Sequence, residues 1–185
     1  MKSKVINNLS FKTNNLIFDE LGIKNNFNVY FKNLNSIGKN VSNYKSSPQI
    51  ELQSLFELNS ELPLIKYDDS TTETLIPRLS FKFNPGDMKN HSDAERKINI
   101  NNIFDANRIG VDDTFEAGGS LTLGINYKKE NNLDNSKYIE YNLATVFRND
   151  DENNIPSQTT LNKKQSNIFG SINYNLSQYA NLEYN

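Results

Sequence analysis

The chain has 185 residues, a formal net charge of −2, a single histidine and no cysteine. This balanced charge creates no basic field that would attract nucleic acid. The absence of cysteine excludes disulfides, thiolate metal sites and cysteine nucleophiles, and one histidine cannot build a histidine-rich metal site. Hydrophobic residues make up only 36% of the chain, but an aromatic content of 11% argues against simple disorder.

No segment of the sequence approaches the roughly 18 apolar residues of a transmembrane helix. The first residues, "MKSKVINNLSF", lack the apolar core of a signal peptide. Taken alone, these absences indicate a soluble protein. A transmembrane β-barrel would give the same absences, because its strands carry a much weaker hydropathy signal than a membrane-spanning helix.

Almost every segment with a regular pattern alternates between apolar and polar residues. The stretch "NNFNVYFKN", for example, places Phe27, Val29 and Phe31 on one face and asparagine, tyrosine and lysine on the other. Alternation with a period of two predicts β-strands that have one apolar and one polar face. The predicted strands that are clearest in the sequence cover residues 25–33, 51–60, 74–84, 120–127, 138–147 and 167–176.

The length of these segments favours a membrane protein. Strands of soluble proteins usually have about 5–6 residues, whereas strands that cross a membrane need about 9–11. Charged residues on the polar faces, such as Arg78, Lys82 and Glu140, suit a wet barrel lumen as well as a solvated sheet. We predict an all-β fold: an antiparallel transmembrane β-barrel segment of about nine or ten long strands that forms an incomplete barrel. A soluble β-sandwich, a β-solenoid or an adhesin module stays the alternative.

The predicted connectors are polar and unequal in length. Residues 84–97 and 148–165 form long connectors, and a very short turn lies near Ser177 and Gln178. Alternation of short and long connectors is typical of outer-membrane barrels. The alternation is not clean through residues 60–115, where the pattern allows either one strand or two.

Two neighbouring stretches, "IPRLSFKFNPGDMKN" and "ININNIFDANRIGVDDTFEAGGSLTLGINY", carry a more specific pattern. A proline-led strand precedes a loop with an Asn-Ile-Phe string, an Asn-Arg pair, an Asp and a Glu-x-Gly, and an alternating strand with glycine follows. This pattern resembles the central barrel region of the outer-membrane lipopolysaccharide-assembly family (the LptD, OstA or organic-solvent-tolerance family), particularly its members from AT-rich alphaproteobacteria. The matching residues are Pro77, Asn102, Phe104, Asn107, Arg108, Asp113, Glu116, Gly118 and Gly124.

The resemblance implies that residues 1–185 are part of a C-terminal barrel domain, without the family's N-terminal periplasmic domain and without the terminal strands of the barrel. It implies a place in the outer membrane of a Gram-negative bacterium and a non-enzymatic role in inserting lipopolysaccharide into the outer leaflet. The implied partners are lipopolysaccharide, outer-membrane lipids, a plug lipoprotein of the LptE type and a periplasmic bridge protein of the LptA type. The resemblance implies no cofactor and no nucleic acid.

One departure from the family pattern changes the expected ion pairs. The family's Asp-Arg pair is Asp113-Thr114 here, so no family salt bridge can be transferred to Thr114. Arg108 could instead pair with Asp113 or with Glu116. We expect residues 101–118 to be packed structure that contributes to the lumen of the barrel or to its exit side.

The alternation also assigns the faces of the strands. Gly118 and Gly124 would mark bends or points of close backbone approach. Arginine at Leu123 would be costly in a complete barrel, whereas arginine at Thr122, on the polar face, would be mild. The candidates for contact with lipid are Leu79, Phe81, Leu121, Leu123, Ile125, Leu143 and Ile172.

No constellation of residues predicts catalysis or metal binding. His91 stands beside Ser92 and Asp93, but a Ser-His-Asp triad needs its members on separate elements, so we expect His91 in a solvated loop. The acidic residues at 68–69 and 150–152 lack the spacing of a calcium loop. We therefore predict no catalytic residue and no metal ligand. A general pore or adhesin barrel is the second class of function, and an outer-membrane hydrolase is the third.

Overall fold

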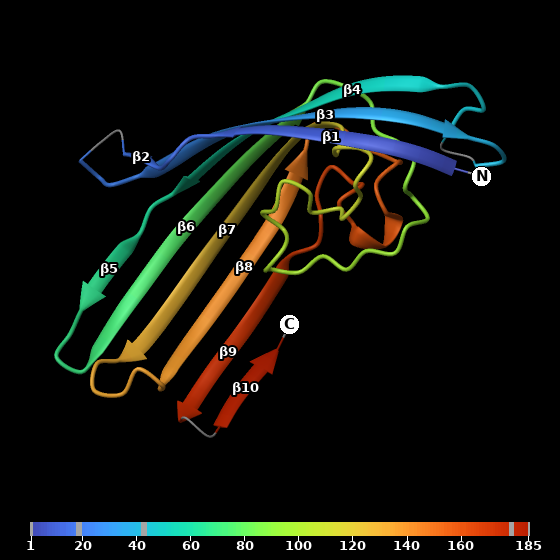
Figure 1. Ribbon diagram of the computed structural model, residues 1–185. Coiled ribbons are helices and arrows are strands. Elements are labelled where there is room, and N and C mark those ends of the chain that lie inside the picture. The colour runs from blue at the N-terminus through green and yellow to red at the C-terminus, as the bar shows by residue number, and fades with distance from the viewer. Residues whose placement is uncertain (1, 18–19, 42–43, 178–179, 185) are drawn as a thin grey trace.

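The computed structural model describes residues 2–17, 20–41, 44–177 and 180–184, and these residues form one antiparallel sheet of ten strands (Figure 1). The predicted all-β antiparallel class is confirmed. The sheet is open, in the order β1-β3-β4-β6-β7-β8-β9-β10, with β2 paired to β3 and β5 paired to β6. The strands are β1 (Lys2–Lys12), β2 (Leu16–Ile17), β3 (Lys24–Gly38), β4 (Gln49–Glu61), β5 (Leu64–Tyr67), β6 (Thr71–Asn84), β7 (Gly118–Asn131), β8 (Tyr138–Arg148), β9 (Phe169–Ser177) and β10 (Ala180–Tyr184).

Five of the six segments with the clearest alternation lie within β3, β4, β6, β7 and β8, and the sixth, residues 167–176, begins two residues before β9. The alternation did not locate β1, β2 or β5, whereas β10 follows the turn that was predicted near Ser177. In β1 the apolar run is broken by Asn7, and the strand is defined by its pairing with β3, from Lys2 opposite Gly38 to Lys12 opposite Asn28. Pairing with a neighbouring strand supplies the backbone hydrogen bonds of β1 even though its sequence does not clearly predict a strand.

The two longest connectors, residues 85–117 and 149–168, lie at one end of the sheet, together with the connection between β3 and β4 (Figure 1). The turns at residues 68–70 and 132–137 lie at the other end, as does the connection between β1 and β3, which contains β2. The region that was ambiguous in the sequence contains two strands, β5 and β6, followed by the long connector. The predicted turn near Ser177 includes Gln178, which is outside the described residues.

The sheet has one apolar and one polar face, and the described residues leave the apolar face uncovered. Its side chains are exposed by 39–50% at five of the candidate lipid contacts, which are Phe81, Leu123, Ile125, Leu143 and Ile172. The two other candidates, Leu79 and Leu121, are half-buried on the same face. We call this the outward face and the opposite one the inner face.

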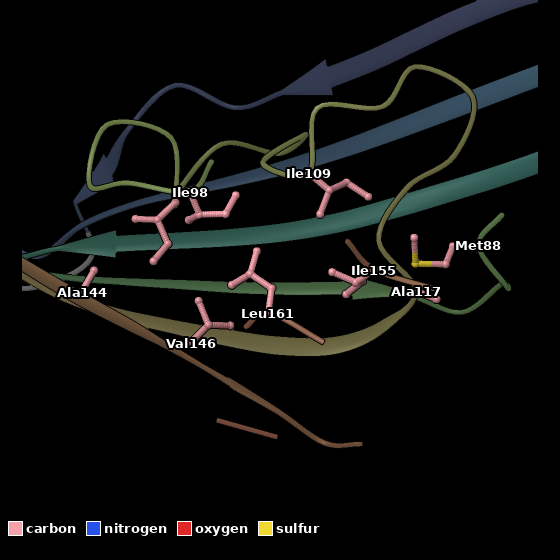
Figure 2. Packing of buried hydrophobic residues seen from close by; sticks show 9 residues of the cluster. Met88, Ile98, Ile109, Ala117, Ala144, Val146, Ile155 and Leu161 are labelled. Atoms are coloured by element: carbon pink, nitrogen blue, oxygen red, sulfur yellow. The ribbon is translucent and has the colours of Figure 1, made fainter. Parts of the chain in front are cut away.

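The inner face is covered near the long connectors by residues 85–117, the inner loop, and residues 149–168, the second loop (Figure 1). Figure 2 shows the apolar side chains of these loops packed between the loops and the sheet. The hydrophobic core therefore forms on the polar side of the sheet. It consists of Met88, Ile98, Ile103, Ile109 and Ala117 from the inner loop, Ala144 and Val146 from β8, and Ile155 and Leu161 from the second loop.

Pro77 lies inside β6, where a proline removes one hydrogen bond from the ladder. On the side of β6 away from β7, β6 pairs with β5 as far as Leu75 and with β4 from Arg78 onward. Pro77 is at the junction, where its carbonyl accepts a bond of 3.1 Å from the N–H of Leu62. The missing donor thus falls at a break in the ladder. No helix among the described residues is long and apolar enough to cross a membrane.

Candidate functional site

The contact between the inner loop and the sheet is centred on Arg108, whose side chain is fully buried. Its Nε donates to Glu116 Oε2 at 2.7 Å, and its Nη2 donates to Glu116 Oε1 at 2.5 Å. Arg148, at the end of β8, also donates to Glu116 Oε1. One carboxylate thus pairs with two guanidinium groups in a buried site, which makes each partner costly to remove.

The same guanidinium group ties the loop to the inner face of β7. Arg108 donates to Ser120 Oγ at 2.8 Å and to Thr122 Oγ1 at 2.8 Å. Arg148 closes the contact by donating to the carbonyl of Ala117. Thr122 is fully buried under Arg108 and does not face water, so the condition on which a mild Thr122→Arg was expected is not met. The alternation placed Thr122 on the correct face, but the loop covers that part of the face.

Electrostatics keep Glu116 ionised. Burial alone would raise the pKa of this carboxyl, but the charges of Arg108 and Arg148 and the hydrogen bonds from Arg108 lower the pKa to about 2. The ion pair is therefore charged at any physiological pH. Of the two pairings that the sequence allowed for Arg108, the structure contains the one with Glu116.

A second anchor holds the tip of the inner loop. The ring of Phe104 lies against Gly124 of β7 so closely that a Cβ atom at Gly124 would be 2.6 Å from the Cζ of the ring. The guanidinium carbon of Arg78 lies 4.3 Å from the centre of the same ring. A glycine at position 124 is therefore needed to admit the aromatic side chain. Gly118, with a φ of +74°, makes the predicted bend at the start of β7.

A buried lysine of β6 adds a third contact beneath Phe104. Lys82 Nζ donates to the carbonyl of Phe104 at 3.0 Å and to the carbonyl of Asp105. Its ion-pair partner is Glu57 of β4, at 3.7 Å. The backbone of the loop tip is thus held by a charge that comes from the sheet.

Asp113 forms a separate cluster near the connector between β3 and β4. The hydroxyl of Tyr44 donates to Asp113 Oδ2, and His91 Nε2 lies 2.9 Å from Asp113 Oδ1. Burial opposes ionisation of Asp113, but the bonds from His91 and Tyr44 still hold its pKa below the usual range. The expectation of a solvated His91 is wrong, because the imidazole is only 17% exposed and bridges the inner loop to this carboxylate.

The other residues of the family-like pattern have minor places. Asn102 accepts from the N–H of Asn99 and donates to the carbonyl of Lys97, which stabilises a turn within the loop. Asn107 is exposed, and Pro77 lies outside the site in β6. Of the pattern's members, Arg108 contacts Glu116 and Phe104 contacts Gly124.

Sequence reasoning missed several partners of these residues. They are Lys82, Ser120, Thr122 and Arg148, all of which lie at polar positions of the alternating strands. The alternation assigned these four residues to the inner face of the sheet. The charged residues of the loop that precedes β7 were the signal that polar partners should be sought on that face. Among the described residues, no group of three or more acidic, histidine or cysteine side chains could hold a metal ion.

Comparisons of the chain with protein-family models, with curated proteins and with solved structures found no match.

Proposed function

We propose that this chain forms part of the wall of a β-barrel in the outer membrane of a Gram-negative bacterium, and that the barrel inserts lipopolysaccharide into the outer leaflet. In this proposal the outward face contacts lipid, and the inner loop fills part of the lumen. The observation that carries the proposal is the inverted polarity of the sheet, whose apolar face is exposed while ordered loops cover the polar face.

The dimensions of the apolar face support a membrane location. On β6 the outward positions from Leu75 to Phe83 are all uncharged, over about nine residues, which is the length of a spanning strand. At one end this band is closed by the ion pair between Lys129 and Glu73, at 2.9 Å. The rings of Tyr127 and Tyr141 stack beside it, as aromatic girdles do at a membrane surface.

The arrangement of the connectors supports an orientation. Outer-membrane barrels have short periplasmic turns and longer extracellular loops. The end with residues 85–117 and 149–168 would therefore face outward from the cell, and the turns at residues 68–70 and 132–137 would face the periplasm.

The lipopolysaccharide part of the proposal depends on the family-like pattern. Four of its residues form two contacts: Arg108 pairs with Glu116 within the inner loop, and Phe104 packs against Gly124 of β7. The proposed partners are lipopolysaccharide, outer-membrane lipids, a plug lipoprotein of the LptE type and a bridge protein of the LptA type.

The test uses the full native polypeptide in its source cells. A photo-reactive amino acid at Asn126, on the inner face, should crosslink to lipopolysaccharide, whereas one at Leu123, on the outward face, should crosslink to phospholipid or lipid A acyl chains. Depletion of the protein should lower lipopolysaccharide at the cell surface. An outer-membrane protein whose depletion leaves surface lipopolysaccharide unchanged would be a pore or adhesin instead, and a protein found in a soluble fraction would fit the β-sandwich alternative.

A further inference from the structure

Two polar hollows, of about 360 and 380 Å³, adjoin on the inner face beside the tip of the inner loop. Glu61, Arg78 and Phe104 line both, so Arg78 and the loop tip separate one hollow from the other. The remaining walls are mainly amide, hydroxyl and carboxylate groups from the strands. The further lining residues that matter below are Lys24, Asn59, Ser60, Glu57 and Asp105 in the first hollow, and Asn126, Glu140 and Asn142 in the second.

Arg78 has hydrogen-bonding capacity that the described residues do not use. Its guanidinium plane stacks on Phe104 at 4.3 Å, but among the described residues it has no ion pair and no hydrogen bond. Stacking occupies the face of the group and leaves its five N–H donors in the plane available. This differs from Arg108 and Arg148, which both donate to Glu116 and to further acceptors of the inner loop or β7.

Acceptors lie on both sides of Arg78. In the first hollow Glu57 is 3% exposed, yet its Oε1 accepts no hydrogen bond and lies 3.7 Å from Lys82 Nζ. In the second hollow Asn126 donates to Glu140 Oε1 at 2.7 Å and to Asn142 Oδ1 at 2.6 Å. These bonds fix the direction of the side chains and leave the second oxygen of Glu140 without a donor among the described residues.

The charges of the lining exclude an anion as the preferred ligand. Four carboxylates line the hollows, from Glu57, Glu61, Asp105 and Glu140, against the cations Lys24 and Arg78. Lys24 is already 3.9 Å from Glu61, and the buried Lys82 serves Glu57. A ligand with many hydroxyl groups and no net charge can donate to the carboxylates and accept from Arg78 at the same time.

We propose that the two hollows form one binding site for the hydroxyl groups of an uncharged sugar, with Arg78 as its central donor. Its place in a transport path depends on the function proposed above, because the site lies on the face that would line the lumen. The sugar would meet the wall directly beside the loop tip, so Arg78 would contact both the ligand and Phe104.

The test is saturation-transfer NMR of the full native polypeptide in detergent micelles, with maltohexaose as the uncharged probe. We expect transfer to the sugar, and a loss of affinity of about tenfold for Arg78→Gln, which removes charged hydrogen-bond donors. Asn126→Leu should weaken binding in the same way. The control is Lys66→Gln, because Lys66 is an exposed residue of β5 that lines neither hollow.

Folding is checked by the protease resistance of the inner loop, and Arg78→Lys gives a second variant that keeps the positive charge but loses the planar fork. Arg78→Lys should lose affinity about as strongly as Arg78→Gln. Absence of sugar binding, or equal binding by all variants, would overturn the site. Displacement of the sugar by inorganic phosphate would overturn the proposal that the site prefers an uncharged ligand.

The outcome is separable from that of the proposed function. Sugar binding by a protein that does not reach the outer membrane would refute the barrel and retain the site. An outer-membrane protein that exports lipopolysaccharide normally after Arg78→Gln, and shows no sugar transfer in micelles, would retain the barrel and refute the site.

Discussion

The two faces of this sheet differ in what covers them. The outward face holds exposed leucine, isoleucine and phenylalanine, whereas the inner face holds buried arginine, lysine, serine and threonine beneath two ordered loops. In a soluble β-sandwich the apolar faces would meet and the polar faces would contact water. The difference teaches that the loops of this chain fold onto the polar face because they bring their own apolar core and their own counter-charges.

The largest expected effect comes from the charge balance that holds the inner loop to the polar face. Glu116→Gln leaves Arg108 and Arg148 buried without their carboxylate, so it should destabilise the fold by about 3–5 kcal/mol. Denaturant unfolding measures the loss, and proteolysis of the inner loop locates it. The matched control, Glu130→Gln, removes a partly exposed pair with Lys128 and should cost less than about 1 kcal/mol. Equal effects of both changes would refute the anchoring role.

Acid should weaken the same anchor. The pKa of Glu116 is about 2 in the fold against an ordinary value of 4.5, so its stabilisation is complete above pH 4.5 and is lost as the pH falls toward 2. The shift corresponds to about 3 kcal/mol as an order of magnitude. Unfolding free energies measured from pH 7 to pH 2 should show this decline. Glu116→Gln should remove much of the decline; an unchanged acid profile in the variant would contradict the assignment.

A charged residue introduced on the outward face should be destabilising when that face contacts lipid. In the barrel proposed above, Leu123→Arg should cost about 2–4 kcal/mol near the middle of the bilayer, as measured by folding into lipid vesicles. The comparison variant is Asn175→Arg, at a partly exposed inner position of β9, because Thr122 is fully buried. Similar tolerance at Leu123 and Asn175 would refute the assignment of the faces.

The smallest expected effect probes the fit of Phe104. Gly124→Ala places a methyl group 2.6 Å from the ring, so it should destabilise the loop contact by about 1–3 kcal/mol. Phe104→Leu in the same chain should recover part of the loss. Gly86→Ala is the control, because its nearest atom would be 3.5 Å away. If both glycine variants unfold at the same denaturant concentration, the packing of Phe104 does not require a glycine at position 124.

The sequence predicted the sheet well and the site in part. Alternation located six strands and assigned Leu123 and Thr122 to opposite faces, because each side chain's direction follows from its position in the strand. It could not show that Thr122 would be covered, since Arg108 reaches it from a loop. It also could not choose between Asp113 and Glu116 as the partner of Arg108.

The sequence by itself determined that the chain is an antiparallel sheet with one apolar and one polar face, since that information is local and repeats every two residues. Only the tertiary structure decided which face is covered, that Phe104 fits against Gly124, and that Asp113 pairs with His91 and Tyr44. These outcomes depend on the path by which the two long, irregular loops fold back onto strands that are distant in the sequence. Their geometry is set by packing and by the pairing of buried charges, which no local pattern specifies.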